Sequence, residues 1–174
     1  MHSYYVNYKL ADGIIVNIQI TDSGGIEKFK QINNNYYENA DCFFIVFDIT
    51  DVQSFQDATN FFISKIEENC KKNYKILLVG NKTDLEVKRE ISYEKGSIFA
   101  KQHNYSYIET SCVKIDNNVF LAFQTLVEIT HMKVDEKDKG KNKEREIEDK
   151  KLRYYDNFEE KLYLFPKIMD FLNN

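Results

Sequence analysis

The sequence of 174 residues is long enough for one globular domain with an appendage, and 43% of its residues are apolar and 30% charged. The formal net charge of −4 excludes the basic surface typical of nucleic-acid-binding proteins, so no nucleic-acid partner is expected. The apolar runs are too short to cross a bilayer and the amino terminus lacks the apolar core of a signal peptide, which predicts a cytoplasmic protein.

The first predicted elements are two β-strands at residues 4–9 and 14–20, the second with alternating apolar residues. Asp12 and Gly13 between them are typical of a tight hairpin turn in which both central residues have positive φ. Three cysteines, at positions 42, 70 and 112, have no close pairing and predict neither a disulfide framework nor a zinc site.

From residue 42 onward, apolar runs alternate with helix-length amphipathic segments. Strands are predicted at 42–48, 75–81 and 105–111, and helices at 54–69, 92–103 and 117–132. Ser54 and Ser92 are the candidate N-caps of the first two helices. This alternation predicts an α/β fold with a mostly parallel sheet flanked by helices.

After residue 132 the composition changes. Residues 133–151 alternate positive and negative side chains and predict a charged linker or an exposed helix. Residues 152–174 carry an amphipathic helical stripe interrupted by Pro166. The predicted domains are therefore 1–132, the linker 133–151 and an amphipathic tail 152–174, with a charged helical C-terminal extension beyond the sheet.

Four short motifs now indicate a family. They are DSGG at 22–25, the run NYYENADCFFIVFDITDVQSF at 35–55, GNKTDL at 80–85 and ETS at 109–111. In order and spacing they resemble the Ras superfamily of small GTPases, most of all the Rab family, across residues 4–132. The resemblance implies the small GTPase fold and a guanine nucleotide, GTP or GDP with Mg²⁺, as the cofactor.

The resemblance assigns base recognition to the loops after two strands. Asp84 is expected to accept two hydrogen bonds from the guanine edge, Asn81 to brace the neighbouring loop, and Lys82 to lay its alkyl stem over the ring. Ser111 and Cys112 are expected to offer backbone N–H groups to the guanine oxygen. The alternative for the NKTD residues is a polar turn that caps a strand.

Asp22 matches the aspartate that steadies Mg²⁺ through water, and Gly25 the glycine whose N–H senses the γ-phosphate. A simple loop after a strand is the alternative for these residues. The next residue is Ile26, where the family places the glutamine that orients the attacking water. Intrinsic GTP hydrolysis is therefore expected to be weak, and no catalytic residue is assigned.

The phosphate-binding pattern GxxxxGK followed by Ser or Thr is absent from the sequence, as is the switch threonine. The fold is thus expected to lack the family's first strand and first helix. Losing three charge-assisted hydrogen bonds of about 2 kcal/mol each would weaken phosphate binding by roughly four decades. The lost strand is expected to leave a gap in the sheet, which either closes or is filled, with the apolar tail at 162–172 a candidate filler.

Two functions remain open from the sequence. One is a shortened Rab-like GTPase that switches between GTP and GDP states in vesicle traffic or signalling. The other is a complete pseudo-GTPase that acts as a protein-interaction or structural subunit. Protein effectors or a larger assembly are the expected partners. The sequence holds no cysteine after Cys112, so no prenyl anchor is evident, and any membrane association is expected to be peripheral through partners.

Overall fold

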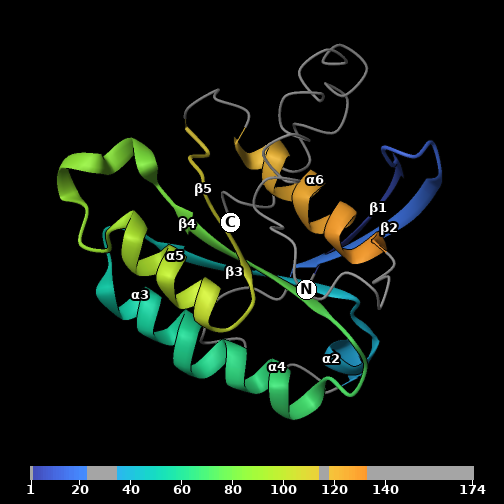
Figure 1. Ribbon diagram of the computed structural model, residues 1–174, viewed down its shortest axis with the longest axis horizontal. Helices are drawn as coiled ribbons and strands as arrows, with labels where there is room; N and C mark the ends of the chain where they lie inside the picture. Colours follow the sequence, from blue (N-terminus) through green and yellow to red (C-terminus); the bar gives the residue numbers. More distant parts are fainter. Residues whose placement is uncertain (1, 23–34, 114–117, 133–174) are drawn as a thin grey trace.

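The computed structural model describes residues 2–22, 35–113 and 118–132. Its centre is a parallel sheet in the order β3 (Cys42–Asp48), β4 (Lys75–Asn81), β5 (Ser106–Glu109), with helices on both faces (Figure 1). The register pairs Asp48 with Asn81 and Gly80 with Glu109, so the three carboxyl ends lie at one edge. The α/β fold class predicted from the apolar runs is confirmed.

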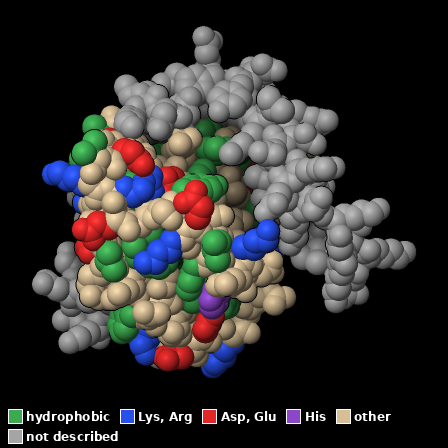
Figure 2. All heavy atoms as spheres, turned by 60° about the vertical axis from the view of Figure 1, so that its left-hand side comes forward, with side chains coloured by type: hydrophobic (Ala, Val, Ile, Leu, Met, Phe, Trp, Pro, Cys, Tyr) green, Lys and Arg blue, Asp and Glu red, His purple; other side chains and the backbone are tan. Residues whose placement is uncertain are grey.

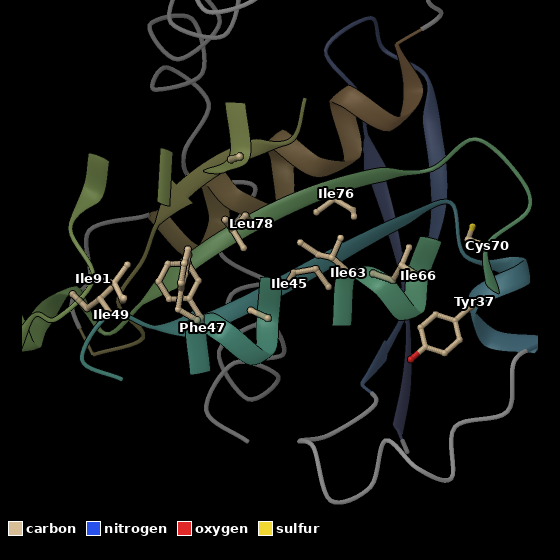
Figure 3. Close-up of a cluster of buried hydrophobic side chains, with 13 residues drawn as sticks. Tyr37, Ile45, Phe47, Ile49, Ile63, Ile66, Cys70, Ile76, Leu78 and Ile91 are labelled. Atoms are coloured by element: carbon tan, nitrogen blue, oxygen red, sulfur yellow. The ribbon is translucent and has the colours of Figure 1, made fainter. Parts of the chain in front are cut away.

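One face of the sheet is covered by a long helical segment and by α5 (Tyr93–Gln102). The long segment comprises α3 (Val52–Gln56), the π-helical stretch η1 (Asp57–Phe62) and α4 (Ile63–Asn69), and the short α2 (Asn35–Asn39) packs at its end. Figure 3 shows the strand side chains Ile45, Phe47 and Leu78 in one cluster with Ile63 and Ile66 of α4. This apolar cluster is the main core.

The predicted N-cap of the long helical segment is wrong. The cap is Asp51, whose carboxylate accepts a hydrogen bond of 2.8 Å from the backbone N–H of Gln53. Ser54 instead accepts from the N–H of Asp48 at 2.9 Å and donates to the carbonyl of Asp51 at 2.8 Å. The predicted cap Ser92 is confirmed, because its hydroxyl accepts from the N–H of Lys95 at 3.2 Å.

The opposite face of the sheet is covered by α6 (Asn118–His131). Leu77 and Val79 of β4 pack there against Ala122 and Leu126 of the helix, and all four are buried. The central strand β4 is therefore buried on both faces, as its continuous apolar run requires, whereas Val46 of the edge strand β3 is 40% exposed.

The hairpin of β1 (His2–Lys9) and β2 (Ile15–Asp22) is confirmed, but its turn is not the predicted one. Residues 10–14 form a longer loop closed by a hydrogen bond of 2.8 Å from Leu10 N to Ile14 O. Gly13 has a φ of +90°, whereas the backbone of Asp12 does not enter the left-handed region. Only one residue of this loop therefore needs the conformational freedom of glycine.

Among the described residues no strand lies between β2 and β3, and the hairpin forms a sheet of its own. The hairpin packs beside α6 instead (Figure 1), where Nε2 of Gln124 donates to the hydroxyl of Tyr8 at 3.1 Å. The rings of Phe44 and Phe123 lie with centroids 4.5 Å apart, and Ile20 of β2 packs in the same cluster. An apolar hollow between the hairpin and α6 is lined by Val6, Tyr8, Ile18, Ile20, Phe120, Phe123, Gln124 and Val127.

The surface carries both signs of charge. Figure 2 shows Lys and Arg side chains interspersed with Asp and Glu on the visible described face. No helix in the described ranges is both long and apolar enough to cross a bilayer. The predicted linker 133–151 and tail 152–174, including the candidate strand filler, lie outside the described residues.

Candidate functional site

The carboxyl edge of the sheet brings together five of the predicted site residues. Asn81 ends β4, and Lys82 and Asp84 follow it. Ser111 and Cys112 lie in the loop after β5, separated from its end by one residue. Because the strands are parallel, the two loops after β4 and β5 lie side by side. Ligands of open α/β sheets bind at this edge.

The β4 loop starts with a strained residue. Lys82 has φ 70° and ψ 37°, the left-handed conformation that non-glycine residues seldom adopt. Its ammonium lies 2.6 Å from Oδ2 of Asp48 at the end of β3. Burial would raise the pKa of Asp48, but hydrogen bonds from Lys82 and Thr50 outweigh burial and lower that pKa. The ammonium of Lys82 is thus held over the end of the neighbouring strand.

Asn81 and Thr83 tie the two loops together. Oδ1 of Asn81 accepts hydrogen bonds from the hydroxyl of Thr110 at 3.1 Å and from the thiol of Cys112 at 3.7 Å. Thr83 donates to the carbonyl of Thr110 through its backbone N–H at 3.1 Å and through its hydroxyl at 3.2 Å. Asn81 and Thr83 thus connect the loop after β4 with residues 110 and 112.

The central contact is made by Asp84. Its Oδ1 accepts a hydrogen bond of 2.6 Å from the hydroxyl of Ser111, which is fully buried. The same hydroxyl oxygen accepts from the N–H of Val113 at 3.1 Å. Burial raises the pKa of the adjacent Cys112 thiol, and its hydrogen bond to Asn81 acts in the opposite direction. A half-buried carboxylate in a fixed orientation can accept hydrogen bonds from a ligand with paired N–H donors.

Comparison with known proteins identifies the family. The Ras family profile matches residues 2–132. The chain belongs to the Ras family. It is 39% identical over 115 residues to Ras-related protein Rab-11B of Dictyostelium discoideum, which covers 66% of this chain and 51% of that protein. It is 33% identical over 138 residues to GTP-binding protein ypt2 of Schizosaccharomyces pombe, with 79% of this chain and 68% of that protein covered.

A third relative is Ras-related protein Rab-13 of Canis lupus familiaris, 37% identical over 115 residues, with 66% of this chain and 56% of that protein covered. The Ras-family chain thus spans between about half and two thirds of the length of these relatives. Similarity to Rab proteins, expected from the four motifs, is confirmed.

Of the remaining predicted site residues of this Ras-family chain, one lies within the described residues. Asp22 is the last residue of β2, on the hairpin, while Gly25 and Ile26 lie outside the described residues. In the described ranges no group of three or more His, Cys, Asp or Glu side chains is arranged to hold a metal ion.

None of the four sequence motifs points to Arg89, which links several groups in this part of the Ras-family chain. Its guanidinium makes ion pairs with Glu86 at 2.7 Å and with Glu109 at 2.8 Å. Hydrogen bonds to Glu109 and Glu86 raise the pKa of Arg89. The spacing of three between Glu86 and Arg89 could have indicated the first pair. The second joins the segment after β4 to the last residue of β5, and the sequence holds no signal for it.

Proposed function

We propose that the chain reads a guanine base at the carboxyl edge of its parallel sheet, as part of a Rab-like GTP/GDP switch in vesicle traffic or signalling. The observation that carries the proposal is the hydrogen bond of 2.6 Å between Ser111 and Oδ1 of Asp84. This hydrogen bond orients the Asp84 carboxylate in the loop after the parallel strand β4 of a Ras-family chain.

Asp84 would select guanine over adenine. Guanine presents its N1–H and its 2-amino group on one edge, and a carboxylate accepts both with charge-assisted hydrogen bonds. Adenine has an acceptor at N1 and no 2-amino group, so it would offer the carboxylate neither of these hydrogen bonds. An ionised carboxylate has about four lone-pair positions, and the bond from Ser111 uses one of them.

The neighbouring residues would complete the base site. The backbone N–H groups of Ser111 and Cys112 would face the guanine oxygen, and Asn81 would hold their loop through Thr110 and Cys112. Lys82 would lay its alkyl stem along the ring while its ammonium stays on Asp48, 2.6 Å away.

The residues proposed to bind the phosphates are assigned only from the resemblance to the family. Asp22 and Gly25 are the residues that would serve Mg²⁺ and the γ-phosphate, and we assign no phosphate contact to the other residues. Bound Mg²⁺ would neutralise phosphate charge there. Protein effectors, which could also hold the chain at a membrane, are the proposed partners.

Ile26 favours a second candidate. An isoleucine side chain can neither donate nor accept a hydrogen bond to an attacking water, so it gives no support to hydrolysis. The second candidate is a pseudo-GTPase that acts through protein contacts without turning over nucleotide.

The test is calorimetric titration of the 174-residue chain with GDP and with a non-hydrolysable GTP analogue in the presence of Mg²⁺. ADP is the control ligand. Asp84→Ala should abolish binding, whereas Asp41→Ala, at an exposed residue paired with Lys72, should leave it unchanged. Guanine-selective binding that depends on Asp84 supports the proposal. No heat from a folded sample would overturn it in favour of the pseudo-GTPase.

A further inference from the structure

The guanidinium of Arg89 uses every one of its donors. Nε and Nη2 donate to the two carboxylate oxygens of Glu86 at 2.7 Å, and Nη1 and Nη2 donate to those of Glu109 at 2.8 Å. Nη1 also donates to the carbonyl of Ile91 at 3.0 Å. These five contacts match the five N–H groups of a guanidinium. Lysine, with three donors on one atom, cannot reproduce the arrangement.

The two carboxylates differ in burial. The side chain of Glu109 is 14% exposed and that of Arg89 17%, whereas that of Glu86 is 63% exposed. The Arg89–Glu109 pair is therefore the more firmly held of the two, because breaking a buried pair leaves an uncompensated charge. Glu86 lies in the exposed segment that follows β4.

We call Arg89 and its partners Glu86 and Glu109 the clamp. Each glutamate lies two residues along the chain from a residue of the candidate base site. Glu86 lies two residues after Asp84, and Glu109 lies two residues before Ser111. The hydrogen bonds of Asn81, Thr83 and Asp84 join the β4 loop to residues 110–112, and Arg89 joins the later part of that loop to Glu109 at the end of β5. Arg89 therefore holds the part of the loop that lies beyond these hydrogen bonds.

Tyr107 connects this clamp to the core. Its hydroxyl donates to Oε1 of Glu109 at 2.8 Å. Its ring occupies space left by Gly80 and Gly96, where an added Cβ would lie 2.7 Å and 2.5 Å from tyrosine atoms. The carboxylate of Glu109 is therefore held from both sides, by a packed aromatic residue and by Arg89.

We infer that Arg89 is a positioning residue for base recognition, which holds Asp84 in register with the Ser111–Cys112 loop without touching the ligand. The inference rests on the proposed function for its consequence, which is guanine selectivity. The positioning itself is a property of the free protein, so it can be tested without any nucleotide.

The first test is amide hydrogen exchange of the free chain by NMR, comparing the wild type with Arg89→Gln. The reporters are the N–H groups of Thr83, Leu85 and Val113, which are bonded within or between the two loops. We expect exchange at least about tenfold faster at these amides, and unchanged exchange in β1. Lys72→Gln, which removes an ion pair with Asp41 away from this edge, is the control and should change none of them.

Two further variants separate positioning from folding. Glu86→Gln at its exposed site should leave the fold intact and speed exchange at Leu85 but not at Val113. Arg89→Lys, which keeps the charge and can serve one carboxylate, should fall between the wild type and Arg89→Gln. Unchanged exchange at all three reporter amides in a folded Arg89→Gln variant, or at Leu85 in a folded Glu86→Gln variant, would overturn the inference.

The second test uses GDP and IDP, which lacks the 2-amino group. If the wild type prefers GDP, Arg89→Gln should lower that preference about tenfold, because Asp84 loses its orientation. A general loss of stability would weaken both ligands equally and leave the ratio unchanged, which would contradict the inference. If the wild type binds neither, the proposed function fails, while the exchange data still decide whether Arg89 positions the loops.

Discussion

The hydroxyl of Ser111 lies 2.6 Å from Oδ1 of Asp84 and joins two loops separated by 27 residues of sequence. Ser111 is fully buried and Asp84 is half-buried, so the bond is formed where water competes little for either group. The contact converts a flexible acidic side chain into one with a defined direction.

Removal of that hydroxyl should weaken guanine binding. In Ser111→Ala the carboxylate of Asp84 loses its donor and Val113 N–H loses its acceptor. Affinity for GDP, measured by calorimetry, should fall roughly tenfold. Ser64→Ala, which removes a hydroxyl that donates to the carbonyl of Asn60 within the helical segment at 2.8 Å, is the matched control. Equal GDP affinity in Ser111→Ala and the wild type would contradict the prediction.

Gly96 should not tolerate a side chain. A Cβ at this position would lie 2.5 Å from Cζ of Tyr107 and 2.6 Å from its hydroxyl oxygen. Overpacking of this kind costs roughly 1–3 kcal/mol, more than the gain of about 1 kcal/mol in helix propensity. Gly96→Ala should therefore lower the urea midpoint of unfolding. Ile98→Ala at an exposed position of the same helix serves as the control, and a midpoint for Gly96→Ala at or above the wild type would refute the argument.

Asp48 should contribute stability that depends on pH. Its pKa is lowered in the folded chain, so its contribution is fully present above the unfolded value near ~3.9 and is lost as the pH falls through the folded pKa. Urea unfolding of the wild type and Asp48→Asn at several pH values tests this. The difference in free energy of unfolding should be largest near neutral pH and shrink below about pH 4. A difference that is constant with pH would show that the ion pair with Lys82 is not its source.

Cys112 should report on occupancy of the base site. Burial raises the pKa of its thiol, so less of the reactive thiolate is present at neutral pH and alkylation should accelerate as the pH is raised. Mass spectrometry after treatment with iodoacetamide would give the rate at Cys112. Saturating GDP should slow it, with the buried Cys70 as an internal reference. Equal rates with and without GDP, in a sample that binds GDP, would place the nucleotide elsewhere.

Much of the fold could be predicted because two of its parallel strands are continuously apolar. The runs at 42–48 and 75–81 are apolar without alternation, and the structure places strands with these bounds. The start of the first long helix could not be read as reliably. Asp51 and Ser54 are both good N-cap residues, and only the end of β3 decides between them, because the hydroxyl of Ser54 is taken by Asp48.

In the candidate site, the residues could be predicted from the sequence but their contacts could not. Asn81, Lys82 and Asp84 could be identified because polar residues that end a buried strand are unusual and their order resembles a family motif. The partners of these residues could not. The ion pair of Lys82 with Asp48 and the clamp of Arg89 on Glu109 join segments that only the folded sheet brings together.

The contact between Tyr8 and Gln124 joins residues 116 apart in sequence, whereas β3, β4 and β5 follow one another along the chain. Contacts of such separation form late during folding, because the entropy cost of closing a long loop comes before the contact can stabilise it. We therefore expect the three-stranded core to form first and the hairpin to dock on α6 last. During synthesis the amino-terminal hairpin emerges from the ribosome before the core strands and α6. Its apolar face would therefore lack the contacts with α6 until that helix has been synthesised.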